Sequence, residues 1–259
     1  INDPGDDLAM QALILTLPSE STMAELSEEI DVEAIHAVRT FMLRELGKNM
    51  TKQWKGLYFD NLGSGPYVHN GKEVGRRSLK NLALRYLSNA KTDDSLQLLE
   101  KQISNSDNMT DRLSALATLI NDPRPSAINT ANELVLNQWF QLQASCSLPG
   151  TLERVKALIS HSAFDFKNPN KVRSLIGVFC SSNPTNFHSD SGVGYQFLTD
   201  HVLSLDKVNP QIAARILAPL TRWRRFPKAR GECMRAHLDK VVSFNGLSRD
   251  TYEIASKSL

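Results

Sequence analysis

Apolar residues recur along this chain at the three- and four-residue steps of an amphipathic α-helix, with polar residues between them. One such run includes Leu79 and Leu87 and predicts a helix that opens near Arg76. Alternating patterns typical of strands are nearly absent, and Asn70-Gly71 lacks the flanking alternation of a hairpin. The pattern therefore predicts a helical chain, with further helices over 96–103, 113–120 and 152–159.

The predicted helices are about 10–16 residues long and are joined by short polar turns, as in arrays of helical hairpins. We therefore expect an all-α fold, a superhelical stack of helical hairpins of the HEAT/armadillo-like α-solenoid type. Residues 1–259 are expected to form a single α-solenoid domain, with a soft boundary in the Gly-rich loop over 62–72. Helix pairs recur at about 34–44 residues, a period typical of such arrays, and begin near Val74, Asn108, Thr151 and Tyr195.

Residues that can cap a helix stand before most of these runs. Their side-chain oxygens can accept one of the unpaired N–H groups of the first helical turn. The longest irregular segment is expected over 181–194, which is rich in Ser, Asn and Gly. The expected capping residues are Thr92 or Asp93, Thr110, Ser126, Asn168, Asn209 and Ser248.

The phrase Asn-Pro opens two of these helices, at 168–169 and again at 209–210. Asn suits the N-cap, and Pro suits the first helical position, where a missing N–H costs nothing. Each helix then carries one arginine among apolar residues, Arg173 in the first and Arg215 in the second. From the residues alone, each arginine is either solvated or ion-paired, or is kept to bind an anion.

Helical spacing places Arg173 on a face with Gly177 and Cys180, beside the apolar core stripe. Arg215 lies at the edge of a similar stripe that contains Ile212 and Ile216. Both arginines are therefore expected to flank the core rather than to point away from it. The core stripe beside the first arginine is formed by Val172, Leu175, Ile176 and Phe179.

Composition and charge narrow the class of protein. Hydrophobic residues make up 41% and charged residues 22%, enough for a sizeable core. The net charge of +2 argues against a dedicated nucleic-acid binder, which needs a marked basic excess. One basic run, 222–230, interleaves aromatic residues with cations. We expect a turn with cations near a helix C-terminus; an RNA-binding solenoid is the alternative that rests on this run alone.

The cysteines Cys146, Cys180 and Cys233 are odd in number and far apart, without C-x-x-C spacing. This usage fits a reducing compartment better than a disulfide framework. No apolar run approaches the roughly 20 residues of a membrane helix, and no signal peptide is recognised. We expect a cytoplasmic protein without a membrane partner, and a start at Ile1 suggests a fragment of a longer chain.

Several phrases, taken in order, closely resemble the C-terminal helical domain of the bacterial aminopeptidase N family, which are zinc alanyl aminopeptidases. The resemblance runs from about Asp3 to the last residue; it is dense over 108–259 and looser over 50–74. Its specificity comes from many phrases in the right order rather than from one motif. These phrases are the two Asn-Pro helices, 139–144, 182–188 and 247–253.

The resemblance implies a non-catalytic domain that caps the catalytic domain of the same polypeptide and encloses the chamber for peptide substrates. It implies zinc in the intact enzyme, which would remove N-terminal amino acids from peptides. Carried over by the matching phrases, Arg173 and Arg215 are the expected substrate-binding residues. A guanidinium suits this role because its planar fork can bind a carboxylate with two hydrogen bonds.

No catalytic residue, metal ligand or cofactor is expected within this chain. The zinc signature H-E-x-x-H is absent, because none of the six histidines is followed by Glu. The adjacent Ser, His and Asp over 188–191 indicate a polar loop, since catalytic triads join residues distant in sequence. The chain is therefore predicted to be inactive alone. A stand-alone helical-repeat scaffold that binds a protein partner is the alternative from another class.

Overall fold

The computed structural model describes residues 7–63, 65–126, 128 and 136–259. Within this part of the chain, all regular secondary structure is helical. The chain divides into two compact units: unit 1 comprises Ile1–Met23 and His36–Glu133, and unit 2 comprises Ala24–Ile35 and Leu134–Leu259. The Gly-rich loop over 62–72 lies inside unit 1. A single domain with a soft boundary in that loop stays a prediction.

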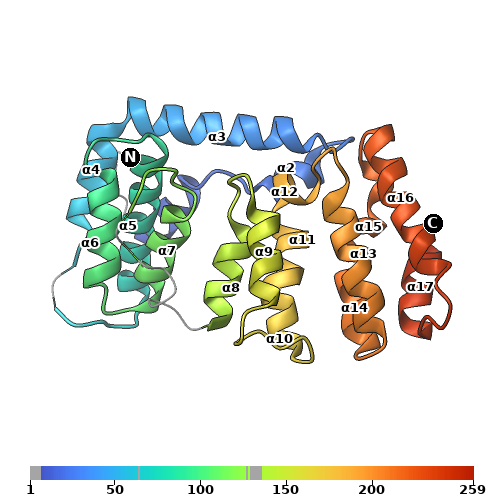
Figure 1. The fold of residues 1–259 in the computed structure, drawn as a ribbon. Helices are drawn as coiled ribbons and strands as arrows, with labels where there is room; N and C mark the ends of the chain where they lie inside the picture. The colour runs from blue at the N-terminus through green and yellow to red at the C-terminus, as the bar shows by residue number, and fades with distance from the viewer. Residues whose placement is uncertain (1–6, 64, 127, 129–135) are drawn as a thin grey trace. The chain divides into compact units, whose positions relative to one another are not determined.

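Unit 1 consists of helices joined mostly by short turns, and the longer Gly-rich loop lies between α4 and α5 (Figure 1). Helix α5 contacts α1, α4, α6 and α7, so it is the central helix of this unit. Helices α2 and α3 each begin in one unit and end in the other. The bounds are α1 Leu8–Ile14, α2 Glu20–Leu26, α3 Val32–Asn49, α4 Thr51–Asp60, α5 Gly71–Asn89, α6 Ser95–Asn105 and α7 Met109–Leu119.

Close helix packing in unit 1 depends on one aromatic stack and two glycines. The rings of Trp54 and Tyr86 are stacked with centroids 4.1 Å apart. A Cβ at Gly47 would lie 2.3 Å from the Tyr86 carbonyl oxygen, and a Cβ at Gly75 would lie 2.7 Å from the Ala9 nitrogen. Because no side chain fits at either position, the glycines let α3 and α1 approach α5 closely.

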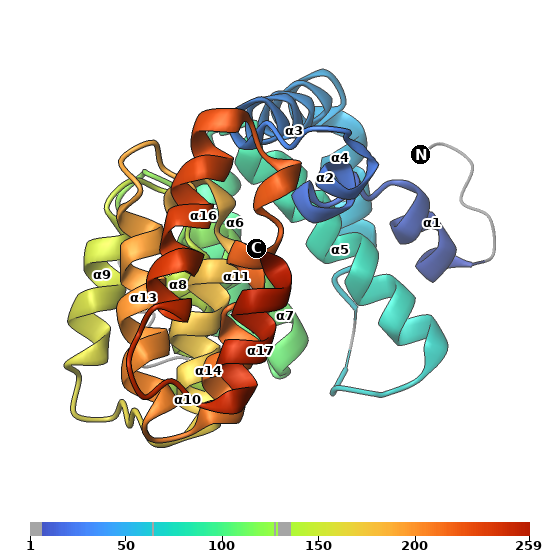
Figure 2. The same cartoon turned by 90° about the vertical axis from the view of Figure 1, so that its right-hand side faces the viewer.

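Unit 2 holds the remaining helices. Helix α13 packs against α14 and α16, and α17 packs against the same two helices, so these four helices form one group (Figures 1 and 2). A π-helical segment, Arg173–Gly177, joins α10 to α11 without a break. The bounds are α8 Leu136–Ser145, α9 Thr151–Ile159, α10 Pro169–Val172, α11 Val178–Ser182, α12 Pro184–Phe187, α13 Val193–Asp206, α14 Pro210–Ile216, α15 Ala218–Thr221, α16 Lys228–Val242 and α17 Arg249–Ser258.

A continuous apolar core fills unit 2. Phe179 makes edge-to-face contacts with Phe187 and Phe197, at centroid distances of 6.2 and 5.5 Å. Such contacts stabilise aromatic pairs beyond the area that they bury. The predicted core stripe is confirmed, because the structure buries all of its members, Val172, Leu175, Ile176 and Phe179.

The Asn-Pro phrases begin helices as predicted. The side chain of Asn168 accepts a hydrogen bond from the Asn170 nitrogen, and that of Asn209 accepts one from the Ile212 nitrogen. A third Asn-Pro phrase caps α12, where Asn183 occupies the N-cap. The expectation of an irregular segment over 181–194 is therefore wrong in part, because this segment contains α12 and the start of α13.

Other predicted helix starts are confirmed or corrected by the cap geometry. Ser248 caps α17 as expected. Helix α7 is capped by Asn108 rather than Thr110, because Asn108 has extended backbone geometry and accepts from the Asp111 nitrogen. Helix α5 begins at Gly71, before the predicted start, because Asn70 caps it.

The structure does not confirm the other two expected caps. Neither Thr92 nor Asp93 caps α6, whose N-cap position is Asp94 without a side-chain cap bond. The residues that follow Ser126 lie partly outside the described ones, so its expected cap stays a prediction. Among the described residues, no helix combines the length and the apolarity that crossing a bilayer requires.

Candidate functional site

Arg173 is the first residue of the π-helical segment in unit 2. Its side chain is exposed and is held near the helix start. Its Nε donates to the Pro169 carbonyl at 3.2 Å, and its Nη2 donates to Asn170 Oδ1 at 3.1 Å. These partners are neutral, so the guanidinium keeps its charge available for an anion.

The π-helical segment changes the face on which Arg173 lies. Helical spacing predicts that Arg173 shares a face with Gly177 and Cys180. The prediction holds for Gly177, where a Cβ would lie 3.9 Å from the Arg173 Cβ, but Arg173 is exposed whereas Cys180 is buried. It is wrong for Cys180 because a π-helical turn contains more residues than an α-helical turn and so rotates the residues that follow it. Gly177, at the end of the segment, would meet nothing closer than 3.9 Å with a Cβ, so this glycine is not required by crowding.

Arg215 lies in the last turn of α14, beside the buried residues Ile212 and Ile216. Its side chain is exposed. Helix α14 packs against the π-helical segment that begins with Arg173. In the described part of the chain, neither guanidinium forms an ion pair with a carboxylate. The structure thus has two exposed and uncompensated arginines on neighbouring elements of unit 2.

The basic run over 222–230 makes contacts within unit 2 instead. Arg222 pairs with Glu25 at 2.8 Å, and Arg230 pairs with Glu33 at 2.7 Å. Arg225 donates to backbone carbonyls, among them Ser27 at 2.6 Å. The run forms a short 3₁₀ turn, Trp223–Arg225, ahead of α16. Arg224 donates to the Ser258 carbonyl at 2.8 Å, so the arginines of this run hold the segment from the end of α2 to the start of α3 and the C-terminal residues.

His188 is buried beside Tyr195, and its Nδ1 lies 2.9 Å from the Tyr195 hydroxyl. Burial, together with the charges of Arg230 and Arg222, lowers the pKa of His188 to about 3. The neighbouring Asp190 pairs with Arg230 rather than with the histidine. This stretch is therefore an internal polar contact and lacks the Ser-His-Asp arrangement of a triad.

The ligand chemistry of the described residues does not favour a metal. No group of three or more His, Cys, Asp or Glu side chains gathers there in a way that could hold an ion. Cys146 and Cys180 are buried and Cys233 is partly exposed, and none of them is in a disulfide. Burial raises the pKa of the Cys180 thiol, which keeps it protonated.

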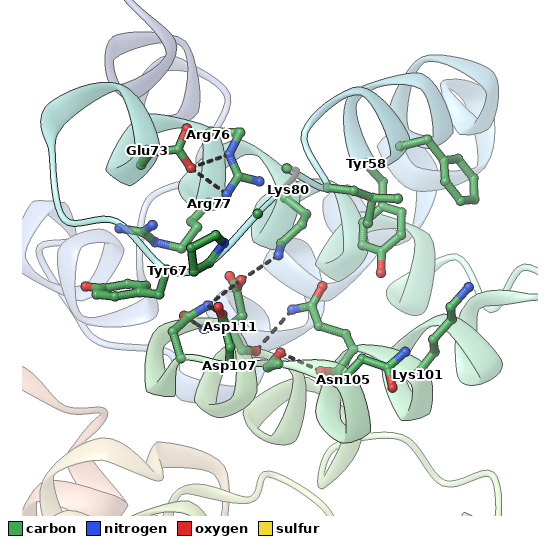
Figure 3. A pocket seen from close by; sticks show the side chains of 18 of the residues that line it. Tyr58, Tyr67, Glu73, Arg76, Arg77, Lys80, Lys101, Asn105, Asp107 and Asp111 are labelled. Carbon is green, nitrogen blue, oxygen red and sulfur yellow. Dashed lines mark hydrogen bonds and ion pairs between the residues drawn. The ribbon is translucent and has the colours of Figure 1, made fainter.

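A cavity of about 320 Å³ in unit 1 is a further site, which the sequence interpretation missed (Figure 3). One face of α5 lines it with charged residues at steps of three and four: Glu73, Arg76, Arg77 and Lys80. That spacing is a polar stripe readable in the sequence. Together with the apolar stripe of the same helix, this polar stripe indicates that α5 has a second, polar face.

Comparisons with known proteins agree with this all-helical structure. The family model described as "Domain of unknown function (DUF3458_C) ARM repeats" matches residues 1–259, so the chain belongs to this family. The chain is 38% identical over 262 residues to Aminopeptidase N of Escherichia coli (strain K12), with 98% of this chain and 30% of that protein covered. It is 35% identical over 266 residues to Aminopeptidase N of Caulobacter vibrioides, with 99% of this chain and 31% of that protein covered.

A solved structure is similar over nearly the whole chain. It is the crystal structure of Legionella pneumophila aminopeptidase A in complex with aspartic acid, with a TM-score of 0.86 and 31% identity. The match covers 99% of this chain and 32% of that one. The resemblance to aminopeptidase N and the predicted all-α solenoid are therefore confirmed. The chain spans about 30% of the length of the curated relatives that it matches.

Proposed function

We propose that this chain is the C-terminal, non-catalytic helical domain of a zinc-dependent aminopeptidase N. The observation that carries the proposal is the match of the whole chain to about 30% of proteins named Aminopeptidase N. The remaining part of such a polypeptide would contain the catalytic domain. The intact enzyme would remove N-terminal amino acids from peptides in the cytoplasm.

The zinc chemistry belongs to the rest of the polypeptide. The described residues offer no ligand set for zinc, and the chain lacks H-E-x-x-H. No catalytic step is therefore assigned to residues of this chain. Its contribution would be to cap the catalytic domain, to enclose the substrate chamber and to restrict entry to short or unfolded peptides.

Arg173 and Arg215 are our candidates for contact with the peptide. Both guanidiniums are exposed, lack a carboxylate partner in the described part of the chain, and lie on elements that pack together. A peptide held at its N-terminus by a catalytic site presents a carboxylate at its far end. Arginine can bind such a carboxylate through two parallel hydrogen bonds.

Exposed apolar residues support the presence of a neighbouring domain. Val38, Phe41 and Met42 follow one another at helical spacing on α3, and all three are exposed. Soluble proteins rarely leave contiguous apolar surface uncovered unless another surface binds there. We propose that the rest of the polypeptide covers this stripe.

Activity measurements on separated parts test the domain assignment. We expect no hydrolysis of an alanyl chromogenic substrate by this chain with added zinc. We expect activity to change when the chain is mixed with the separately expressed upstream part of its polypeptide. Zinc-dependent turnover by this chain alone would refute the proposal. No activity of the chain alone and no change on mixing would favour the stand-alone scaffold.

Substitution of the two arginines tests their proposed role in the intact enzyme. We expect Arg173→Ala and Arg215→Ala each to raise KM for a short peptide with a C-terminal carboxylate by about tenfold. The reason is that a charge-assisted hydrogen bond contributes roughly 1.5–3 kcal/mol. A matching peptide with an amidated C-terminus should show little change, since it lacks the anion.

The control for these variants is Arg249→Ala, which removes an exposed arginine at the start of α17 in the same unit. This control should leave KM unchanged for both the carboxylate and the amidated peptide. An equal rise in KM for the carboxylate and amide peptides would show that the arginines act through structure or overall charge. It would contradict a direct contact with the peptide carboxylate.

A further inference from the structure

The cavity in unit 1 lies among α4, α5, α6 and the start of α7, and two helices line it with regular stripes. Helix α5 contributes the charged stripe that runs from Glu73 to Lys80. Helix α6 contributes Lys101, Gln102 and Asn105; Asn105 neighbours both of the others on the helix surface, because it follows them by four and three residues. The cavity is therefore walled mainly by polar side chains held on rigid elements.

Some of the charged side chains that line the cavity form ion pairs and hydrogen bonds with one another or with nearby residues. Lys80 and Asp111 form a buried ion pair with Nζ and Oδ2 2.5 Å apart. Arg76 pairs with Glu73 at 2.7 Å (Figure 3). The second oxygen of Asp111 accepts a hydrogen bond from the Asn81 amide at 2.9 Å. These groups have partners for their charges, so they need no ligand.

Two further cations on the wall have no carboxylate partner among the described residues. Arg77 is only 3% exposed, yet its contacts are a hydrogen bond to the Val68 carbonyl and the face of the Tyr67 ring. Lys101 is exposed and forms no ion pair within the described part of the chain. The charge of Glu73 acts on Arg77 only at a distance, so a buried guanidinium without a direct carboxylate contact favours an anion in the cavity.

Two polar atoms on the wall also lack hydrogen-bond partners among the described residues. Gln102 Oε1 is buried without a hydrogen bond, although Gln102 Nε2 donates to Asn81 Oδ1 at 2.7 Å and to the Asp111 carbonyl at 3.0 Å. Because both of these partners are acceptors, the amide cannot be turned around to satisfy its oxygen. Gln102 Oε1 therefore needs an N–H or O–H donor from outside the described residues.

The second atom is the hydroxyl of Tyr58, which makes no hydrogen bond to a described residue although Tyr58 is 3% exposed. Figure 3 shows this hydroxyl directed toward the side of the cavity where Lys101 and Asn105 lie. Burial, with a smaller effect of the Asp111 charge, raises the pKa of Tyr58 to about 12. The hydroxyl therefore stays protonated and can donate to an anion.

We infer that this cavity binds a small ligand in which a carboxylate stands next to an N–H group. The carboxylate accepts from the Tyr58 hydroxyl and the Lys101 ammonium, and the N–H donates to Gln102 Oε1. The unpaired Arg77 adds positive potential to the same space, while Asp107 at the rim favours an ammonium. Free amino acids and the C-terminal residue of a peptide share this chemistry. The inference does not rest on the proposed function, because it concerns binding by this chain without catalysis.

Isothermal titration of the 259-residue chain tests the inference with four probes: glycine, N-acetylglycine, glycinamide and inorganic phosphate. We expect binding of glycine, N-acetylglycine or both, and at least tenfold weaker binding of glycinamide, which has the N–H group but no carboxylate. Glycine alone identifies a free amino acid as the ligand class, and N-acetylglycine identifies a peptide C-terminus. The inference would be overturned if glycinamide bound as tightly as glycine and N-acetylglycine, or if inorganic phosphate did so. It would also be overturned if none of the probes bound.

Two variants separate ligand contact from folding. Tyr58→Phe should weaken binding about tenfold without lowering the midpoint of urea unfolding, because the hydroxyl that it removes has no described partner. Tyr86→Phe is the matched control: it removes a hydroxyl that donates to the Leu15 carbonyl at 2.8 Å. It should lower the unfolding midpoint and leave binding unchanged.

Lys101→Gln removes an exposed charge without an ion pair and should also weaken carboxylate binding about tenfold with unfolding unchanged. Carboxylate binding that survives in both Tyr58→Phe and Lys101→Gln would place the ligand elsewhere and would overturn the assignment.

Discussion

Burial of His188 beside two arginines determines how unit 2 responds to acid. The pKa of His188 is about 3 in the folded chain and near 6.5 when unfolded, so between these values the unfolded chain binds the extra proton. Stability therefore falls as pH decreases through this window. We expect the free energy of unfolding to fall by about 2 kcal/mol between pH 7 and pH 5 from this side chain alone, as measured by urea denaturation.

The variant His188→Gln tests this prediction through the slope of stability against pH rather than through stability itself. It removes the titrating group, so the loss between pH 7 and pH 5 should shrink by about 2 kcal/mol even though the ring packing is lost. Asn245→Ala, at an exposed position in unit 2, removes no titrating group and should keep the original slope. An unchanged slope in His188→Gln would show that the histidine is protonated in the folded chain as easily as in the unfolded one.

At the scale of helices, two Asn-Pro caps of the same type should differ in how much free energy of unfolding is lost when the asparagine is replaced by alanine. Asn209 makes one cap bond, to the Ile212 nitrogen, so Asn209→Ala should lower the free energy of unfolding by about 1 kcal/mol. Asn183 also donates to the Ala144 and Cys146 carbonyls, at 2.9 and 2.7 Å within a buried site. Asn183→Ala should therefore cost about 3 kcal/mol, because buried acceptors lose their donor.

Urea unfolding of both variants measures this difference, with Asn245→Ala as a control at an exposed position. The control should leave the unfolding midpoint unchanged. Equal costs for Asn183→Ala and Asn209→Ala would mean that the buried amide contributes nothing beyond its cap.

These caps also show what the sequence can predict. The Asn-Pro phrase fixes both a cap and the first helical residue, so α10 and α14 were predicted at their observed starts. The core stripe around Val172 follows directly from apolar spacing. The third phrase, at Asn183, lies in a segment that the sequence predicts to be irregular, because α12 is too short to show a period.

Other features could not be predicted because they depend on packing between helices. The π-helical turn at Arg173 has no local signature, and it lies where α8 and α14 pack against it. The cavity exists only where polar stripes of α5 and α6 meet Tyr58 of α4. The candidate role of Arg173 and Arg215 rests on the family resemblance, since helical spacing alone indicates only solvated or ion-paired arginines.

At the scale of the whole molecule, exposed apolar surface should govern association. Val38, Phe41 and Met42 are 52%, 52% and 39% exposed on one stripe of α3. Such a stripe is expected to make the isolated chain self-associate in a concentration-dependent way. We expect Phe41→Ser to shift the chain toward monomer in sedimentation velocity, with little effect on stability because the ring is not part of a core.

Val208→Ser is the control, since Val208 is 48% exposed on a turn outside this stripe. It should leave the association unchanged. A chain that is monomeric at all concentrations would show that the stripe on α3 does not promote self-association, and would weaken the argument that another part of the polypeptide covers it.

The π-helical segment that begins at Arg173 lets this helix tolerate the deletion of one residue. A π-helical turn closes its hydrogen bonds one residue further along than an α-helical turn, so it stores one extra residue inside an unbroken helix. Deletion of one residue there can be absorbed by reversion to an α-helical turn, with α10 and α11 still continuous. A deletion within α13 has no such reserve and would rotate every following residue by about 100°, turning Val202 and Leu205 out of the core.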